Sequence, residues 1–247
     1  MTEARLAHVV GFGMGPHHLT REAVRALEGA DVVIAFSKGT DDPLLSVRRA
    51  IAAEFDLRMI EIPDPERDRD SPADYGAAVR DWHEARAAAL ADVLAQDPGV
   101  PAFLVWGDPS LYDSTLRLLA RASQRQPLTW QVSPGISAPQ LLAARHGIVL
   151  HEVGAPVHVT TARGLATAID EGQRTIVVML GGEVTLPGLD EWHIWWGANL
   201  GAPSERLVRG RVADVRAALG AARQQAKQEA GWVMDTYLLR APTGGAS

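Results

Sequence analysis

The stretch GFGMGPHHLT, residues 11–20, follows a short apolar run at residues 7–10. A strand that ends in a glycine-rich turn and leads into a helix is typical of α/β folds. A second turn, WGDPSLY at residues 106–112, follows another apolar run at residues 101–105. Ligands of α/β proteins bind beyond the carboxyl ends of the strands, so both turns lie where we expect a binding site.

The first half of the chain alternates predicted strands and helices. Strands are expected at residues 7–10, 31–36, 59–62 and 101–105, and helices at residues 20–28, 44–54, 73–96 and 114–123, the last with Ser114 as its N-cap. The polar stretch QRQP at residues 124–127 is typical of a linker. We therefore expect a first domain over residues 1–126 and a second over residues 127–247.

The second half also mixes the two kinds of element. Strands are expected at residues 129–132, 157–161, 174–180, 193–196 and 233–239, and helices at residues 138–146, 165–171 and 212–228. With 247 residues, 47% of them hydrophobic, the chain is long enough to bury two cores. The pattern predicts an α/β protein with two domains.

Composition excludes several classes of function. The chain has no cysteine, which rules out disulfides, thiolate catalysis and cysteine-ligated metals. A formal net charge of −6 argues against a nucleic-acid partner, because phosphate binding leaves a basic footprint. No apolar run is long enough for a membrane span, and the N-terminus lacks the pattern of a secretory signal. We expect a cytoplasmic protein without a membrane partner.

The first turn departs from the dinucleotide-binding fingerprint. Gly11 and Gly13 match, but Pro16 stands at the third glycine position and has no backbone N–H for a pyrophosphate. Phe36 ends the second strand where an acidic residue would bind the ribose. The histidines lack metal-ligand spacing, so no metal is expected. We expect the glycine and proline turns to offer main-chain amides to a ligand without a pyrophosphate.

A third motif, PGISA at residues 134–138, completes an ordered set. The chain resembles the tetrapyrrole (corrin and porphyrin) methylases, which carry a glycine-rich first loop, a Gly-Asp-Pro loop and such a segment in this order. DWH at 81–83, IWWGA at 194–198 and GWVMDTYLLR at 231–240 are similar to the deacetylating branch of that family. The resemblance implies a homodimer of two-domain α/β subunits, with mixed sheets flanked by helices and S-adenosylmethionine in the inter-domain cleft.

The resemblance also implies which residues bind the methyl donor. They are Met14, Trp106, Gly107, Asp108, Leu111, Ser137, Ala138, Leu180, Gly201 and Ala202. Some members of the family place an acidic proton acceptor after the second strand. Phe36 stands there in this chain, so that role is not transferred.

The substrate that the resemblance implies is precorrin-5, which loses an acetyl group as acetate and gains a methyl group at C-1. Such a reaction needs an activated water and a stabilised oxyanion. The candidate catalytic residues are His17, His18, Lys38, Asp108, Tyr112 and Asp113. Each also has a purely structural interpretation: the histidines and Asp108 as turn residues, Tyr112 and Asp113 as helix caps, and Lys38 as solvated surface.

Two alternatives stay open. The chain resembles other precorrin C-methyltransferases of the family, which act without deacetylation. From a different class, a non-catalytic tetrapyrrole-binding protein would share the fold.

Trp195 and Trp196 lie on one predicted strand. Because side chains of a strand alternate between its two faces, the two tryptophans lie on opposite faces, and we expect one of them in the core.

Overall fold

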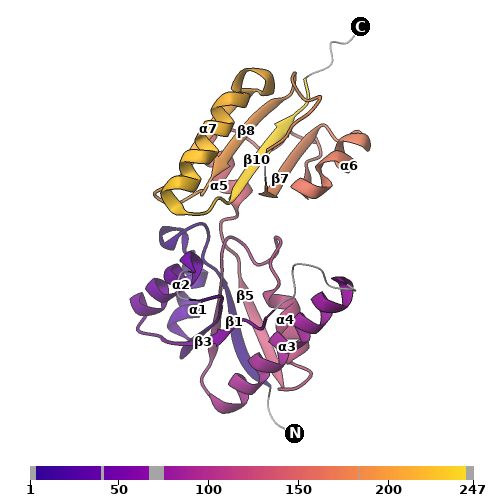
Figure 1. Ribbon diagram of the computed structural model, residues 1–247. Helices are drawn as coiled ribbons and strands as arrows, with labels where there is room; N and C mark the ends of the chain where they lie inside the picture. Colours follow the sequence, from indigo (N-terminus) through magenta and orange to yellow (C-terminus); the bar gives the residue numbers. More distant parts are fainter. Residues whose placement is uncertain (1–3, 40–41, 67–74, 183, 243–247) are drawn as a thin grey trace. The chain divides into compact units, whose positions relative to one another are not determined.

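The computed structural model describes residues 4–39, 42–66, 75–182 and 184–242, and of residues 75–78 the backbone only. It divides into two compact units, Met1–Ile136 and Ser137–Ser247. Each unit consists of one sheet with helices packed on it (Figure 1). The predicted α/β class is therefore confirmed. Among the described helices, none has the length and apolarity needed to cross a bilayer.

The first unit contains a five-stranded sheet in the order β3-β2-β4-β1-β5. Its strands are β1 (Arg5–Gly11), β2 (Val32–Ser37), β3 (Arg58–Pro63), β4 (Pro101–Val105) and β5 (Leu128–Ser133). All its neighbouring strands run parallel. Because β5 pairs with β1 from Arg5–Leu128 to Val10–Ser133, the unit ends after Ile136 and not after Gln126.

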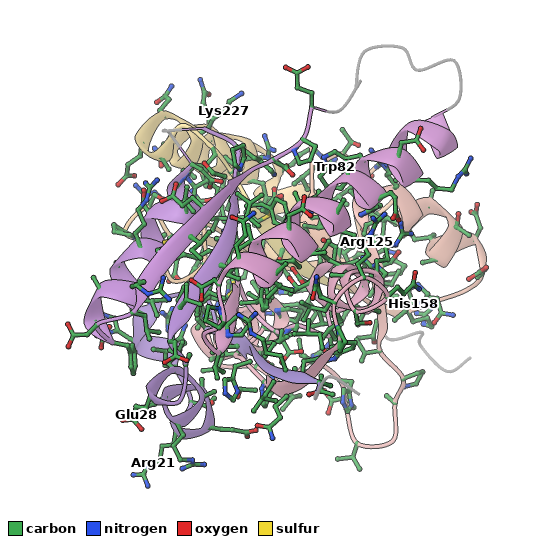
Figure 2. All side chains as sticks on the ribbon, turned by 90° about the horizontal axis from the view of Figure 1, so that it is seen from below. Arg21, Glu28, Trp82, Arg125, His158 and Lys227 are labelled. Carbon is green, nitrogen blue, oxygen red and sulfur yellow. The ribbon has the colours of Figure 1, made fainter. Side chains whose placement is uncertain are left out.

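Helices cover both faces of this sheet (Figure 1). Helices α1 (Arg21–Glu28) and α2 (Pro43–Glu54) pack on one face, and α3 (Tyr75–Gln96) and α4 (Thr115–Ala122) on the other. The Thr20 side chain caps α1 by accepting a hydrogen bond from the Ala23 amide. Arg21 and Glu28 extend from the exposed face of α1 into solvent (Figure 2).

The start of α4 has the expected N-cap residue, and the structural interpretation of Asp113 as a cap of this helix is confirmed. Ser114 occupies the N-cap position, but its side chain makes no capping bond. The Asp113 carboxylate instead accepts a hydrogen bond from the Thr115 amide at 2.6 Å. A carboxylate at this position also suits the partial positive charge of a helix N-terminus.

Strands β1 and β4 lie side by side, and the helices that follow them lie on opposite faces of the sheet. Such a pair marks a topological switch point, and ligands of open parallel sheets bind at the carboxyl ends of its strands. The glycine turn at residues 11–20 follows β1 and the turn at residues 106–112 follows β4. The fold thus brings together two turns that lie about a hundred residues apart in the sequence.

The second unit contains a mixed sheet in the order β6-β7-β10-β8-β9. Its strands are β6 (His158–Thr161), β7 (Thr175–Gly181), β8 (His193–Ala198), β9 (Arg206–Arg211) and β10 (Asp235–Arg240). The β6–β7 pair is parallel and the other pairs are antiparallel. Its helices are α5 (Ala138–His146), α6 (Leu165–Asp170) and α7 (Val212–Ala230), of which α6 and α7 share one hydrophobic cluster.

The two tryptophans of β8 separate as expected. Trp196 is fully buried in the core, and its indole N–H donates to the Asp235 carboxylate at 3.3 Å. Trp195 is half-buried, and the Arg240 guanidinium lies 5.0 Å from its ring centre. Strand β9 was not expected, because its sequence RLVRGR lacks an apolar run.

Candidate functional site

The turns after β1 and β4 form a single interlocked structure. The Gly107 amide donates to the Gly13 carbonyl at 2.8 Å, and the Gly13 amide donates to the Gly107 carbonyl at 3.2 Å. Both glycines adopt positive φ angles, 68° for Gly13 and 76° for Gly107, which side chains rarely tolerate. The Phe12 amide continues the contact by donating to the Val105 carbonyl at 3.0 Å.

The third motif closes on the same structure. A Cβ atom added to Gly135 would lie 2.1 Å from the Gly107 carbonyl oxygen and 2.8 Å from the Gly11 carbonyl carbon. Only a residue without a side chain permits three backbones to approach so closely. The three motifs are therefore joined by direct backbone packing at the switch point.

Asp108 links the turn at residues 106–112 to the third motif at residues 134–138. Its Oδ1 accepts a hydrogen bond from the Ser110 amide at 2.9 Å, and its Oδ2 accepts one from the Gly135 amide at 2.9 Å. Burial alone would raise the pKa of Asp108, but the bonds from Ser110 and Gly135 outweigh burial and lower it. The carboxylate is therefore ionised at neutral pH, and both of its oxygens are engaged within the loops.

The amides of Gly13, Gly107 and Gly135 all donate inside this structure. The expectation that the glycine turns offer their amides to a ligand is therefore wrong for these three positions. The glycines shape the site by allowing the backbones to pack, and hydrogen bonds to the ligand must come from other groups.

Three of the residues expected to contact the methyl donor lie on the same two turns. Met14 follows Gly13 and is 8% exposed. Trp106 directly precedes Gly107, Leu111 follows later in the same turn, and both are half-buried. The set is apolar, as a nucleoside base requires, and Pro16 leaves no amide for a phosphate. The residues thus fit a methyl donor such as S-adenosylmethionine, which carries no phosphate.

The remaining residues expected to contact the methyl donor belong to the second unit. Ser137 is the N-cap of α5, where it forms a capping box with Gln140, and Ala138 is the first residue of that helix. Leu180 lies near the end of β7, is 48% exposed and has a φ of 52°. Gly201 (φ 82°) and Ala202 lie in the loop after β8.

The candidate catalytic residues lie at the carboxyl edge of the first sheet. His17 and His18 belong to a short 3-10 helix, η1 (Pro16–His18), in which His17 is exposed and His18 half-buried. Tyr112 is 48% exposed, and Asp113 follows it at the start of α4. Lys38 is exposed just after β2. In the described part of the chain, no cluster of His, Asp and Glu is placed to hold a metal ion.

Two arginines at this edge, Arg48 of α2 and Arg86 of α3, were not predicted from the sequence. Both lie inside predicted helices, where an arginine is normally solvated, and only the packing of the helices reveals that both are half-buried. Both line a cavity beside Asp113, together with Lys38.

The model of the tetrapyrrole (corrin/porphyrin) methylases matches residues 7–216 of the chain. The chain therefore belongs to this family. A precorrin-6A synthase [deacetylating] from Sinorhizobium sp. is 40% identical over 245 residues, which cover 94% of each chain. The crystal structure of a cobalamin synthesis related protein (CobF) from Corynebacterium diphtheriae is 36% identical, with a TM-score of 0.80 over 98% of this chain and 100% of that one.

The fold also occurs in a more distant structure. A uroporphyrin-III C-methyl transferase from Thermus thermophilus, solved with S-adenosyl homocysteine, is 17% identical and has a TM-score of 0.56. The match covers 96% of this chain and 97% of that one. At this identity the likeness establishes the shared fold alone.

Proposed function

We propose that the protein is a methyltransferase that converts precorrin-5 into precorrin-6A, with S-adenosylmethionine as methyl donor and release of acetate. The observation that carries the proposal is the similarity to the Sinorhizobium precorrin-6A synthase [deacetylating], which extends over nearly the whole of both chains. The interlocked turns at the switch point of the first sheet support the proposal. Their side chains are apolar, and Pro16 offers no amide to a phosphate, which suits a methyl donor that carries no phosphate.

The proposed reaction breaks one carbon–carbon bond and forms another. A water oxygen adds to the acetyl carbonyl carbon, acetate departs, and the electron pair of the broken bond stays on ring carbon C-1. When bound, S-adenosylmethionine supplies the electrophilic methyl group that this carbon accepts. The chain must orient the macrocycle, stabilise the oxyanion of the first step and take one proton from water.

We assign the donor site to Met14, Trp106, Gly107 and Leu111 in the first unit. The proposal extends to Ser137, Ala138, Leu180, Gly201 and Ala202 in the second unit, through the resemblance to the family. Asp108 acts as a positioning residue, because its two oxygens hold the turns together. No metal takes part in the proposed reaction.

His17, His18, Tyr112 and Asp113 are the proposed candidates for activating water or stabilising the oxyanion. They flank the donor turns on both sides, His17 and His18 after β1 and the other two after β4. Asp113 also caps α4, so its replacement affects stability as well as activity. We further propose a homodimer in the cytoplasm.

The test is incubation of the purified protein with precorrin-5 and S-adenosylmethionine, with acetate and methylated product measured together. The proposal predicts both products. Methylation without acetate would instead assign the chain to a precorrin C-methyltransferase that does not deacetylate. Binding of precorrin-5 without either product would assign it to a tetrapyrrole carrier.

A further inference from the structure

A cavity of about 310 Å³ lies in the first unit at the carboxyl ends of β2 and β4. Phe36, Leu104 and Trp82 provide apolar parts of its wall; Trp82 is labelled on α3 in Figure 2. Asp113, which directly follows the second motif turn, forms another part. The cavity therefore adjoins the proposed donor site on the same edge of the sheet.

Arg48 contributes a positive charge to the wall of this cavity. Its Nε–H donates to the Leu104 carbonyl at 2.9 Å, which fixes the guanidinium against β4. Among the described residues, no acceptor is bonded to its two terminal amino groups. Burial lowers the pKa of Arg48, because removing a cation from water is costly, and the nearby charges of Asp42 and Asp113 offset this cost only in part.

Arg86 is a second half-buried arginine on the same wall. It is ion-paired with Asp64, with 3.0 Å between Nε and Oδ1, and both side chains are mostly buried. Its guanidinium lies 4.0 Å from the ring centre of Phe36 and 4.7 Å from that of Trp82. These contacts hold Arg86 in one orientation, as a recognition site requires.

The acidic residues of the wall each have a structural partner. Asp42 caps α2 by accepting bonds from the Leu44 and Leu45 amides, at 3.0 and 3.2 Å. Asp113 caps α4, and Asp64 pairs with Arg86. Arg48 and the exposed Lys38 therefore remain as the cations of this wall that no described carboxylate contacts by hydrogen bond or ion pair.

We propose that this cavity is a carboxylate-binding subsite, in which Arg48 and Lys38 bind an acidic side chain of the macrocyclic substrate. The inference rests on the proposed function, since a tetrapyrrole such as precorrin-5 carries many carboxylates. The planar guanidinium matches a carboxylate with two parallel hydrogen bonds, and the apolar wall strengthens them by excluding water. The subsite would orient the ring beside the donor turns.

The test measures binding of uroporphyrin I, a stable tetrapyrrole whose side chains all end in carboxylates, by fluorescence quenching. Arg48→Gln is expected to raise its dissociation constant about tenfold or more, as loss of a charge-assisted hydrogen bond requires. Lys38→Gln is expected to raise it about threefold, because the lysine is exposed. Arg48→Lys is expected to bind with intermediate affinity, since lysine keeps the positive charge but lacks the planar guanidinium that donates two parallel hydrogen bonds.

Arg49→Gln is the matched control. Arg49 neighbours Arg48 on α2 but forms an exposed ion pair with Glu61 at 2.6 Å, outside the cavity wall. Its variant is expected to bind uroporphyrin I like the unaltered protein. The affinity for S-adenosylhomocysteine is expected to be unchanged in all four variants.

Unchanged uroporphyrin affinity in both Arg48→Gln and Lys38→Gln would overturn the subsite. If Arg48→Gln fails to fold, as judged by its thermal unfolding curve, the exposed Lys38 variant decides alone. The two proposals fail separately. A protein that releases acetate from precorrin-5 but binds uroporphyrin I independently of Arg48 and Lys38 keeps its function and loses the subsite, whereas Arg48-dependent binding without any turnover keeps the subsite and refutes the function.

Discussion

At the scale of single residues, the site depends on a few glycines, because a neighbouring backbone occupies the space that a side chain would take. Gly135 leaves no room for a methyl group, because the Gly107 carbonyl would lie 2.1 Å from it. Asp108 then ties the packed loops together through the Gly135 amide. The glycines seen in the sequence motifs are thus required by packing and dihedral angle, and their role in catalysis is indirect.

Gly135→Ala is expected to lower the free energy of unfolding by about 1–3 kcal/mol, the usual cost of overpacking, and to abolish methyl transfer by separating the turns. Gly220→Ala is the control. Gly220 lies inside α7 with open space around its missing side chain, so this change is expected to stabilise the protein by up to about 1 kcal/mol. Urea unfolding of both variants measures the difference, and equal stabilities would contradict the packing argument.

Asp108→Asn is expected to destabilise the protein by about 1–3 kcal/mol at neutral pH, because an amide N–H₂ would face a backbone donor of Ser110 or Gly135. The pKa of Asp108 is lowered on folding, so its ionised form stabilises the protein above the unfolded pKa of about 3.9. That contribution is lost as the pH falls through the lower folded pKa. In unfolding measurements the difference between the two proteins should stay constant from pH 7 to about 3.9 and shrink as the pH falls further; a difference that persists unchanged at lower pH would refute the role of the ionised carboxylate.

At the scale of elements, helix starts position the site. Thr20 caps α1 directly after the glycine turn, and Asp113 caps α4 directly after the second turn. Thr20→Ala is expected to cost about 0.5–2 kcal/mol, as the loss of an N-cap does. Ser114→Ala, at a cap position without a capping bond, is expected to cost almost nothing. Thermal unfolding of the two variants checks this, and a larger loss for Ser114→Ala would contradict it.

The sequence predicted most elements and the three motifs, because apolar runs and turn residues are local signals. It did not predict β9, where Leu207 and Val208 are flanked by arginines and the strand is stabilised by pairing with β8. It placed the domain boundary before β5, because the polar residues 124–127 resemble a linker but form only the connection from α4 into β5, which pairs with β1. Arg48 escaped notice since its burial depends on contacts that are distant in sequence, such as that with Leu104.

At the scale of the whole molecule, the chain forms two units, each with a core of its own. A ligand that binds only the folded protein stabilises it, by about 2.7 kcal/mol at a concentration of 100 times its dissociation constant. S-adenosylhomocysteine is therefore expected to raise the thermal midpoint, whereas NAD is expected to leave it unchanged because Pro16 removes a pyrophosphate contact. A scanning fluorimetry titration makes the comparison, and stabilisation by NAD alone would contradict the assignment.

If the interlocked turns after β1 and β4 hold the methyl donor, a crystal structure with S-adenosylhomocysteine will show the nucleoside against Met14, Trp106 and Leu111. Density for the nucleoside at any place that leaves residues 106–112 untouched would refute this location of the methyl-donor site.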